Sequence, residues 1–342
     1  MDGPLASAHI ITYNHQPYIA QAVEGALQQR TSFPFEIVIG EDCSTDGTRQ
    51  IVFDYQRRYP QIIRVITSAH NVGVRANAVR AYDACRGKYV AFCDGDDYWQ
   101  NPYKLQMQVD FLETHPEYSL VHTDADWLVD ATGEITPGWH KIHRHPMVQG
   151  DIYEDLLVDN QIMTCTVCVR KEALDRWVSH PVVVRGEDQV VGDYPRWLLL
   201  SMVSKIGYLD VSTTTRRELV HSASKSPDPA RNLAFFLEMY GIREHFLRLR
   251  PPSPPIQAQI RRNYHRGRLK YGYLLQDSRM AWDSYRYLAD AGLLSVTARL
   301  HLLGSKGKTH HAVAKTLIAL KDVVRQGQQA VACWTRPRRA AG

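Results

Sequence analysis

The segment Asp94-Gly95-Asp96-Asp97 contains the residue types that most directly suggest chemistry. Its three carboxylates repel one another unless a cation lies among them, and they follow the apolar segment 89–93. An Asp-x-Asp spacing lets two carboxylates converge on a hard ion such as Mg²⁺ or Mn²⁺, which keeps room for phosphate oxygens. The alternative is an acidic turn in which an aspartate caps a helix. Taken alone, the segment leaves both interpretations open.

Three further polar loops each follow an apolar, strand-like segment. Tyr13 supplies a ring that could stack on a base, and Asp42 could accept hydrogen bonds from a base or a ribose. Asp46 and Gly47, by contrast, are typical of a turn. The loops are Thr12-Tyr13-Asn14, the segment 41–48, and Asn71-Val72-Gly73 with Asn77.

Apolar runs alternate with helical patterns of about a dozen residues over the first two hundred residues, which predicts an α/β unit with a largely parallel sheet. In such sheets ligands lie beyond the carboxyl ends of the strands, and the polar loops follow those ends. The expected strands are 7–14, 35–40, 62–67, 89–93, 119–124 and 162–170, and the expected helices are 17–29, 48–59, 74–85, 104–114 and 194–203.

Length and composition bound the remaining possibilities. The chain has 342 residues, 44% hydrophobic and 23% charged, which excludes a wholly disordered, collagenous or coiled-coil protein. The break at 226–229 predicts two domains, 1–225 and 226–342, the second mainly helical. No apolar run approaches the ~20 residues of a membrane span, and the N-terminus does not resemble a signal peptide. Six cysteines fit a reducing, cytoplasmic setting better than a disulfide framework.

Charge is distributed unevenly along the chain. The net charge is +5, but residues 230–342 carry 20 Lys and Arg against 6 Asp and Glu. A basic helical region could contact an anionic membrane surface at the inner face of the cell membrane, form a homo-oligomer, or be a solvated face. We expect no nucleic-acid partner, because no recognition motif accompanies the charge. The candidate basic residues are Arg261, Arg262, Arg266, Arg268 and Lys270.

The order and spacing of the four polar motifs resemble those of family 2 inverting glycosyltransferases, over roughly residues 6–220. The resemblance implies a GT-A fold, which is a Rossmann-like nucleotide-diphospho-sugar transferase domain, here with a helical C-terminal appendage. It implies transfer of a sugar from a nucleotide-diphosphate sugar to a hydroxyl of a saccharide, lipid-linked, natural-product or protein acceptor. Relatives commonly act in polysaccharide biosynthesis.

The resemblance also implies roles for individual residues. Tyr13 and Asp42 would hold the base, and Asp96 would coordinate the Mg²⁺ or Mn²⁺ ion that bridges the diphosphate. The implied nucleotide-sugar-binding residues are Thr12, Tyr13, Asn14, Asp42, Asn71, Asn77, Asp94, Gly95 and Arg217, with Arg216 in a similar position. The implied metal ligands are Asp96, Asp94 and His221.

Asp193 falls where the family has its catalytic base. Many members have Glu-Asp there, whereas this chain has Gly192-Asp193, and Glu187 and Asp188 are rivals. The base would deprotonate the acceptor hydroxyl on the face opposite the leaving diphosphate, which inverts the anomeric centre. The alternative is that Asp193 only caps the helix that follows it.

Two other functions are compatible with parts of the sequence. A nucleotide-sugar pyrophosphorylase would need a glycine-rich loop near its N-terminus, where 9–30 hold only Gly25, and a nucleic-acid-binding protein would use the basic C-terminal region. Several motifs favour ordinary structural roles. Cys165 and Cys168 are expected in the core, and the segment 304–309 resembles a phosphate loop but has Leu302 where that motif needs glycine. His140, His143 and His145 are expected in an acceptor loop. Trp127, Trp139 and Trp177 either stack on acceptor sugars or belong to the core.

Overall fold

The computed structural model describes residues 3–140, 149–177, 192–220 and 226–319. These residues form two compact units, which are described separately. The first contains the described residues up to 220 together with Ile242–Leu249, and the second contains Ser226–Gly241 and the described residues from Arg250 onward.

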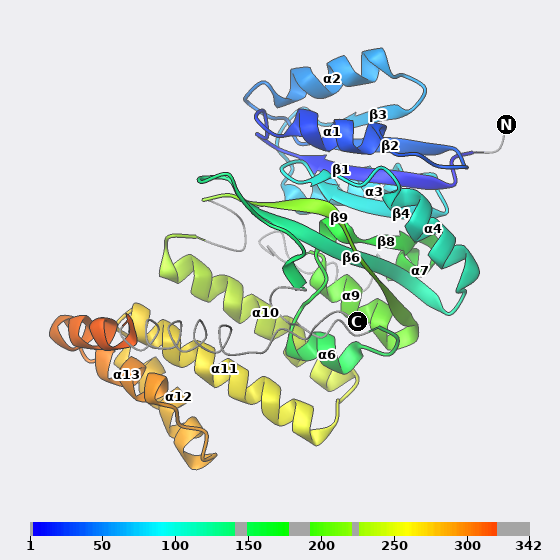
Figure 1. The fold of residues 1–342 in the computed structure, drawn as a ribbon. Helices are drawn as coiled ribbons and strands as arrows, with labels where there is room; N and C mark the ends of the chain where they lie inside the picture. Colours follow the sequence, from blue (N-terminus) through cyan, green and yellow to red (C-terminus); the bar gives the residue numbers. More distant parts are fainter. Residues whose placement is uncertain (1–2, 141–148, 178–191, 221–225, 320–342) are drawn as a thin grey trace, which may run out of the picture. The chain divides into compact units, whose positions relative to one another are not determined.

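The first unit is built on one mixed sheet (Figure 1). Neighbouring strands follow the order β3-β2-β1-β4-β8-β6-β9-β5, and β7 pairs with β6. β1 pairs in parallel with β2 and β4, and β2 with β3, whereas β8 runs antiparallel to β4 and β6. The predicted α/β class is therefore confirmed. The strands are β1 (Ala6–Thr12), β2 (Phe35–Glu41), β3 (Ile63–Thr67), β4 (Tyr89–Asp94), β5 (Tyr98–Trp99), β6 (Tyr118–Val129), β7 (Glu134–Thr136), β8 (Cys168–Arg170) and β9 (Lys205–Glu218).

Helices cover both faces of this sheet, because alternate strand residues point to opposite sides. Ile10 and Ile39 belong to the core that includes residues of α1 (Ile19–Leu27), α2 (Thr48–Arg58) and α4 (Lys104–Thr114). On the other face, Phe92 stacks on Tyr82 and meets Trp197 edge-on. These two partners lie on α3 (Val74–Asp83) and α9 (Tyr194–Val203). Two shorter helices are α6 (Tyr153–Val158) and α7 (Lys171–Asp175).

The sequence prediction was wrong for the segment 162–170. It holds the 3-10 helix η1 (Thr164–Thr166) followed by the short strand β8, instead of one strand. Cys165 and Cys168 in this segment are buried free cysteines, as expected for core residues. The long strand β9 was not predicted at all.

Helices follow the sheet, so the predicted helical C-terminal region is confirmed. They include α10 (Pro229–Leu249), α11 (Pro254–Leu274), α12 (Ser278–Asp290) and α13 (Val296–Gly304), and residues 308–319 are also helical. The end of α10 groups with the first unit, because Arg243 Nε donates to the Leu157 carbonyl at 2.8 Å and the Tyr153 hydroxyl donates to the Phe246 carbonyl at 3.0 Å.

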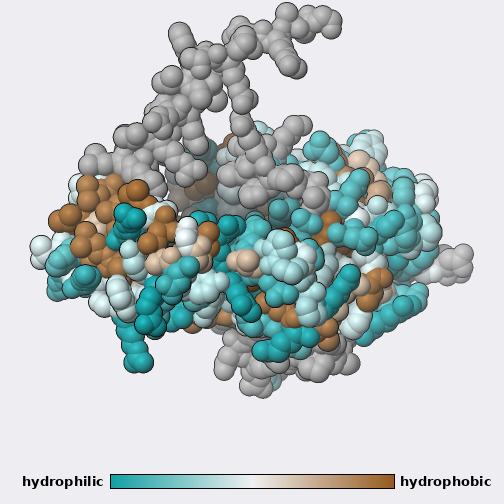
Figure 2. All heavy atoms as spheres, turned by 90° about the horizontal axis from the view of Figure 1, so that it is seen from below, coloured by the Kyte–Doolittle hydropathy of each residue, from teal (hydrophilic) through white to brown (hydrophobic). Residues whose placement is uncertain are grey.

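The second unit has a small apolar core, formed by Leu269, Ala281, Leu288 and Ala298. Apolar side chains also reach its surface. Val296, Val313 and Leu317 are exposed, and Figure 2 shows hydrophobic side chains gathered on the side where α13 lies in Figure 1.

The five candidate basic residues all lie on α11. Arg261, Arg266 and Lys270 are exposed, whereas Arg262 and Arg268 are half-buried. At about 100° per residue, Arg261 and Arg268 lie on a different side of the helix from Arg266 and Lys270, so the five do not share one face. Within the described ranges, every helix is too short or too polar to cross a membrane.

Candidate active site

The carboxyl ends of β1, β2 and β4 meet at one edge of the sheet. Thr12 pairs with Glu41, and Ile11 pairs with Asp94, so the polar loops after the three strands begin side by side. The Gly95 amide donates to the Ile11 carbonyl at 2.8 Å, and the Asp42 amide donates to the Thr12 carbonyl at 3.1 Å. The sheet register thus brings together motifs that lie up to eighty residues apart in the sequence.

Asp94–Asp97 form a tight turn, which we call the acidic turn. It is closed by a bond of 3.0 Å from the Asp97 amide to the Asp94 carbonyl. Gly95 is required here, because an added Cβ would lie 2.8 Å from Thr12 Oγ1 and 2.8 Å from His15 Nδ1. The turn can therefore pack directly against the end of β1 only if it carries no side chain at this position.

The carboxylates of the acidic turn differ in their partners. Asp97 Oδ1 accepts the Arg217 amide at 2.7 Å, whereas Asp94 and Asp96 accept no side-chain hydrogen bond from any residue that the structure describes. Burial and the Asp96 charge raise the pKa of the Asp97 carboxyl to about 7. Burial and the charges of Asp97 and Asp96 also raise the pKa of Asp94 well above its ordinary value. The turn thus brings together three carboxyl groups whose ionised forms repel one another.

The carboxylates of the acidic turn fit a divalent cation only if a bound substrate supplies further oxygen ligands. Of the described residues, no group of three or more His, Cys, Asp or Glu side chains could hold a metal ion. Mg²⁺, however, is commonly bound by one or two carboxylates that share it with substrate phosphates. Asp94 and Asp96 supply two such oxygen donors, and a cation would relieve their repulsion. His221, the third predicted ligand, lies outside the described residues.

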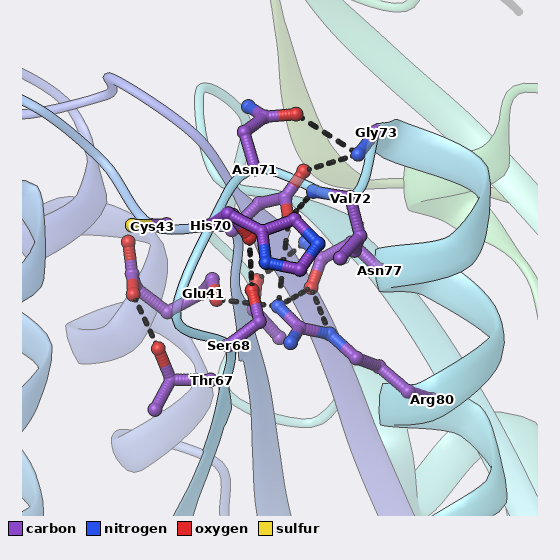
Figure 3. Close-up of polar contacts among 12 residues, drawn as sticks. Glu41, Cys43, Thr67, Ser68, His70, Asn71, Val72, Gly73, Asn77 and Arg80 are labelled. Carbon is purple, nitrogen blue, oxygen red and sulfur yellow. Dashed lines mark hydrogen bonds and ion pairs between the residues drawn. The ribbon is translucent and has the colours of Figure 1, made fainter.

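Asp42 is held by the loop that follows β3. Its Oδ1 accepts the Val72 amide and its Oδ2 accepts the Gly73 amide, both at 2.9 Å, and the carboxylate is 1% exposed. Asn71 Oδ1 accepts the same Gly73 amide at 2.9 Å (Figure 3). Both residues therefore fix the backbone of this loop.

Asn77 and Arg80 support the same loop from α3. Asn77 Nδ2 donates to the Gly40 carbonyl at 2.8 Å, and its Oδ1 accepts from Arg80 Nε at 3.0 Å. Arg80 also donates to the Glu41 carbonyl at 2.6 Å and lies 3.6 Å from Asp42 Oδ1 (Figure 3). Asn77 is thus buried beneath the loop. The sequence analysis missed Arg80, although its position one helical turn after Asn77 could have indicated it.

In the loop after β1, the Tyr13 ring is exposed, whereas Asn14 is bonded to the neighbouring loop. The Tyr13 ring is 40% exposed and is available for stacking, whereas Thr12 is buried. Asn14 adopts a left-handed conformation with a φ of 54°, and its Oδ1 accepts the Thr45 amide at 2.8 Å. Asn14 therefore joins the loop after β1 to the loop after β2.

Asp193 is the N-cap of α9, as the sequence predicts. Its Oδ1 accepts the Tyr194 amide at 2.7 Å, and its Oδ2 accepts the Thr164 hydroxyl at 2.6 Å. The Asp193 charge also contributes to the raised pKa of Asp94, so the cap lies near the acidic turn. The rivals Glu187 and Asp188 lie outside the described residues, as do His143 and His145. His140 is buried, and its amide donates to Asp124 Oδ1 at 3.1 Å.

Arg217 and Arg216 lie on β9 beside the acidic turn. Arg217 Nε donates to the Asp96 carbonyl at 2.9 Å, and Nη1 forms an ion pair of 3.0 Å with Asp130. Arg216 instead covers the ring of Trp127 at 4.4 Å, and its charge lowers the pKa of Asp94 and Asp97 against the effect of burial. A cationic strand end thus faces the anionic turn.

Residues 7–174 match the family model described as Glycosyl transferase family 2. This segment of the chain belongs to that family. The family 2 segment contains the three strand ends, the acidic turn and Thr164, and Asp193 and Arg217 follow it. Membership favours a glycosyltransferase over the pyrophosphorylase and the nucleic-acid-binding protein considered above.

Part of this chain is similar to curated proteins of other organisms. Rv1520 of Mycobacterium tuberculosis is 49% identical over 107 residues, which are 31% of this chain and 31% of that protein. The glycosyltransferase alr2836 of Nostoc sp., which is uncharacterized, is 35% identical over 116 residues, or 34% of this chain and 35% of that protein. The match therefore spans about a third of the length of these curated relatives.

Two solved structures share the fold. Staphylococcus aureus TarS 1–349 in complex with UDP has a TM-score of 0.50 at 17% identity, covering 94% of this chain and 91% of that one. The mannosyltransferase PcManGT from Pyrobaculum calidifontis, in complex with GDP-Man and Mn²⁺, has a TM-score of 0.56 at 16% identity, covering 92% and 87%. At these identities the likeness shows the fold, and the predicted GT-A class is confirmed.

Proposed function

We propose that the protein transfers a sugar from a nucleotide-diphosphate sugar to an acceptor hydroxyl, with inversion at the anomeric carbon. The observation that carries the proposal is that the carboxyl ends of β1, β2 and β4 bring the acidic turn beside the loops that carry Tyr13 and Asp42. The acidic turn could bind the donor diphosphate through a cation, and Asp193 could act as the general base. Family 2 membership and the two nucleotide-bound neighbours support it.

The nucleotide would bind at the loops after β1, β2 and β3. The exposed Tyr13 ring would stack on the base, and Asp42 and Asn71 would offer their remaining lone pairs to the base or ribose. Asn14 and Asn77 would act through the backbone, because both already join neighbouring loops. Thr12 and Gly95 would keep the floor of the site compact.

Asp94 and Asp96 would hold a Mg²⁺ or Mn²⁺ ion together with the diphosphate. When bound, such an ion supplies charge neutralisation to the leaving diphosphate. Of the protein's own cations beside the turn, Arg216 would stabilise the same developing charge, and Arg217 would hold the turn in place through its bond to the Asp96 carbonyl.

Asp193 would accept the proton of the acceptor hydroxyl as that oxygen attacks the sugar. Hydrogen bonds from the Tyr194 amide and the Thr164 hydroxyl hold its carboxylate at the N-terminus of α9. Asp193 caps α9, most of whose residues are buried, so its position is fixed by the fold. A single displacement from the side opposite the diphosphate would invert the anomeric carbon.

For the acceptor and the other partners, we propose only chemical classes. A saccharide, lipid-linked, natural-product or protein hydroxyl would satisfy the chemistry, and polysaccharide biosynthesis in the cytoplasm remains our prediction for the setting. The basic α11 would contact an anionic membrane surface or a second copy of the chain. Co-sedimentation with vesicles of about 30% phosphatidylserine and a mass measurement in solution test these two outcomes.

A ligand screen tests the central proposal. Thermal stability is measured with UDP, dTDP, GDP and their sugar conjugates, each with and without Mn²⁺. We expect one nucleotide series to stabilise the protein through binding to the folded state, and Mn²⁺ to increase the effect. The sugar conjugate of that series then serves as donor, and NMR reports the anomeric configuration of the product. Absence of stabilisation by every nucleotide would refute the proposal.

A further inference from the structure

The two adjacent arginines on β9 have different tasks. Every nitrogen of the Arg217 guanidinium is engaged, since Nε donates to the Asp96 carbonyl, Nη1 pairs with Asp130, and Nη2 donates to Gln21 at 2.8 Å. Its side chain is 10% exposed. Arg217 is therefore committed to holding the acidic turn in place, and it has little capacity left for a ligand.

Arg216 is the uncommitted member of the pair. Successive strand residues point to opposite sides, so its side chain leaves β9 on the other face from Arg217. Within the described part of the chain, its guanidinium forms neither a hydrogen bond nor an ion pair. Arg216 nevertheless lies next to the acidic turn, because the amide of the following residue, Arg217, donates to Asp97 Oδ1 at 2.7 Å. A cation with all five donors unused thus stands beside the acidic turn.

The Trp127 indole holds this cation. Trp127 and Arg216 are register partners in the parallel β6–β9 pair, and the guanidinium carbon lies 4.4 Å from the ring centroid. The indole is fixed in turn, because its Nε1 donates to Glu218 Oε2 at 2.8 Å and Trp139 stacks on it at 4.2 Å. A carboxylate would neutralise the arginine and occupy its donors, whereas an aromatic face fixes the guanidinium and leaves the donors available.

We propose that Trp127 is a positioning residue that holds Arg216 for an anionic oxygen of the donor's terminal phosphate. This inference rests on the proposed function. The family resemblance places both Arg216 and Arg217 near the diphosphate, and this inference assigns the contact to Arg216. The phosphate nearest the acidic turn is the relevant one, because β9 lies against that turn at this point, where the Arg217 amide donates to Asp97 Oδ1 at 2.7 Å.

The test compares a nucleoside diphosphate with its monophosphate. The probes are UDP and UMP, or GDP and GMP, whichever pair the wild-type protein binds with Mn²⁺. Arg216→Ala should weaken binding of the diphosphate about 10- to 100-fold, the usual worth of a charged hydrogen bond, and should leave the monophosphate almost unchanged. Trp127→Leu should weaken diphosphate binding about 3- to 10-fold, and Trp127→Phe less, because it keeps an aromatic face.

A double-mutant cycle separates positioning from a general loss of structure. In the Arg216→Ala background, Trp127→Leu should have no further effect on diphosphate binding, since nothing remains to be positioned. Arg58→Ala is the matched control, because Arg58 covers the Tyr55 ring at a similar 4.5 Å on α2, and it should leave both affinities unchanged. Additive losses, or equal losses for both probes, would overturn the inference. If the wild-type protein binds no nucleoside diphosphate, the proposed function itself fails.

Discussion

Asp193→Asn distinguishes a catalytic base from a helix cap. Asp193 makes two hydrogen bonds, to the Tyr194 amide and the Thr164 hydroxyl. An asparagine carbonyl still accepts the amide, and its NH₂ group can donate to the hydroxyl once that group turns. Asn and Asp are similarly good N-caps, so we expect the free energy of unfolding to change by less than about 1 kcal/mol.

The expected effect on transfer is much larger. Asparagine cannot accept the acceptor proton, and a positioned base usually contributes about 10²–10⁴-fold in rate. This corresponds to roughly 3–5 kcal/mol in the activation free energy. Donor affinity should stay the same, because Asp193 would contact the acceptor and not the nucleotide. Single-turnover transfer measures the first quantity, and calorimetric titration with the donor measures the second.

A second N-cap provides the control. Asp277 caps α12 with a bond of 2.9 Å to the Met280 amide, so Asp277→Asn makes the same chemical change at a helix outside the site. It should alter stability to a similar extent and leave transfer unchanged. Our reasoning is refuted if Asp193→Asn keeps most of its activity, and the base is another carboxylate if Glu187→Gln or Asp188→Asn loses it instead.

Four further predictions concern the acidic turn and its supports. Asp96→Ala should abolish the Mn²⁺-dependent part of nucleoside diphosphate binding without lowering stability, because it relieves repulsion; equal calorimetric affinities with and without Mn²⁺ in the wild type would exclude a metal site. Gly95→Ala should destabilise the protein by about 1–3 kcal/mol in urea unfolding, since its Cβ would clash with the end of β1, whereas Gly241→Ala, on an open helix surface, should not; similar values for both would contradict the packing argument. Arg217→Ala should cost about 1–3 kcal/mol in the same assay, mainly by leaving the Asp96 carbonyl and Asp130 without their partner, and an unchanged midpoint would argue against its structural role. The folded-state pKa of Asp97 is about 7 and its ordinary value is 3.8, so between these values the folded protein keeps a proton that the unfolded chain has lost, and stability falls as pH rises. Without metal, Asp97→Asn should therefore gain stability relative to wild type between about pH 4 and about pH 7, and a constant difference would show that Asp97 does not titrate there.

The sequence alone determined the local elements of the sheet domain and the family. Strands β1 to β4 and the helices between them have strong periodicity and clear ends, so their positions could be predicted within a few residues. The motif order was sufficient for the family assignment, because each motif follows a strand. Asp193 could likewise be predicted as an N-cap, since capping depends on local chemistry.

Only the tertiary structure decided which polar groups are free and which are already used. Sequence cannot show that Asp42 is bonded to the Val72 and Gly73 amides, because those bonds depend on how two loops meet. It also missed β9, whose pairing with β6 is non-local, and so it could not separate Arg217, which supports the acidic turn, from Arg216, which stands free on Trp127. Side chains from distant strands compete for the same hydrogen-bond partners, and only the folded chain settles that competition.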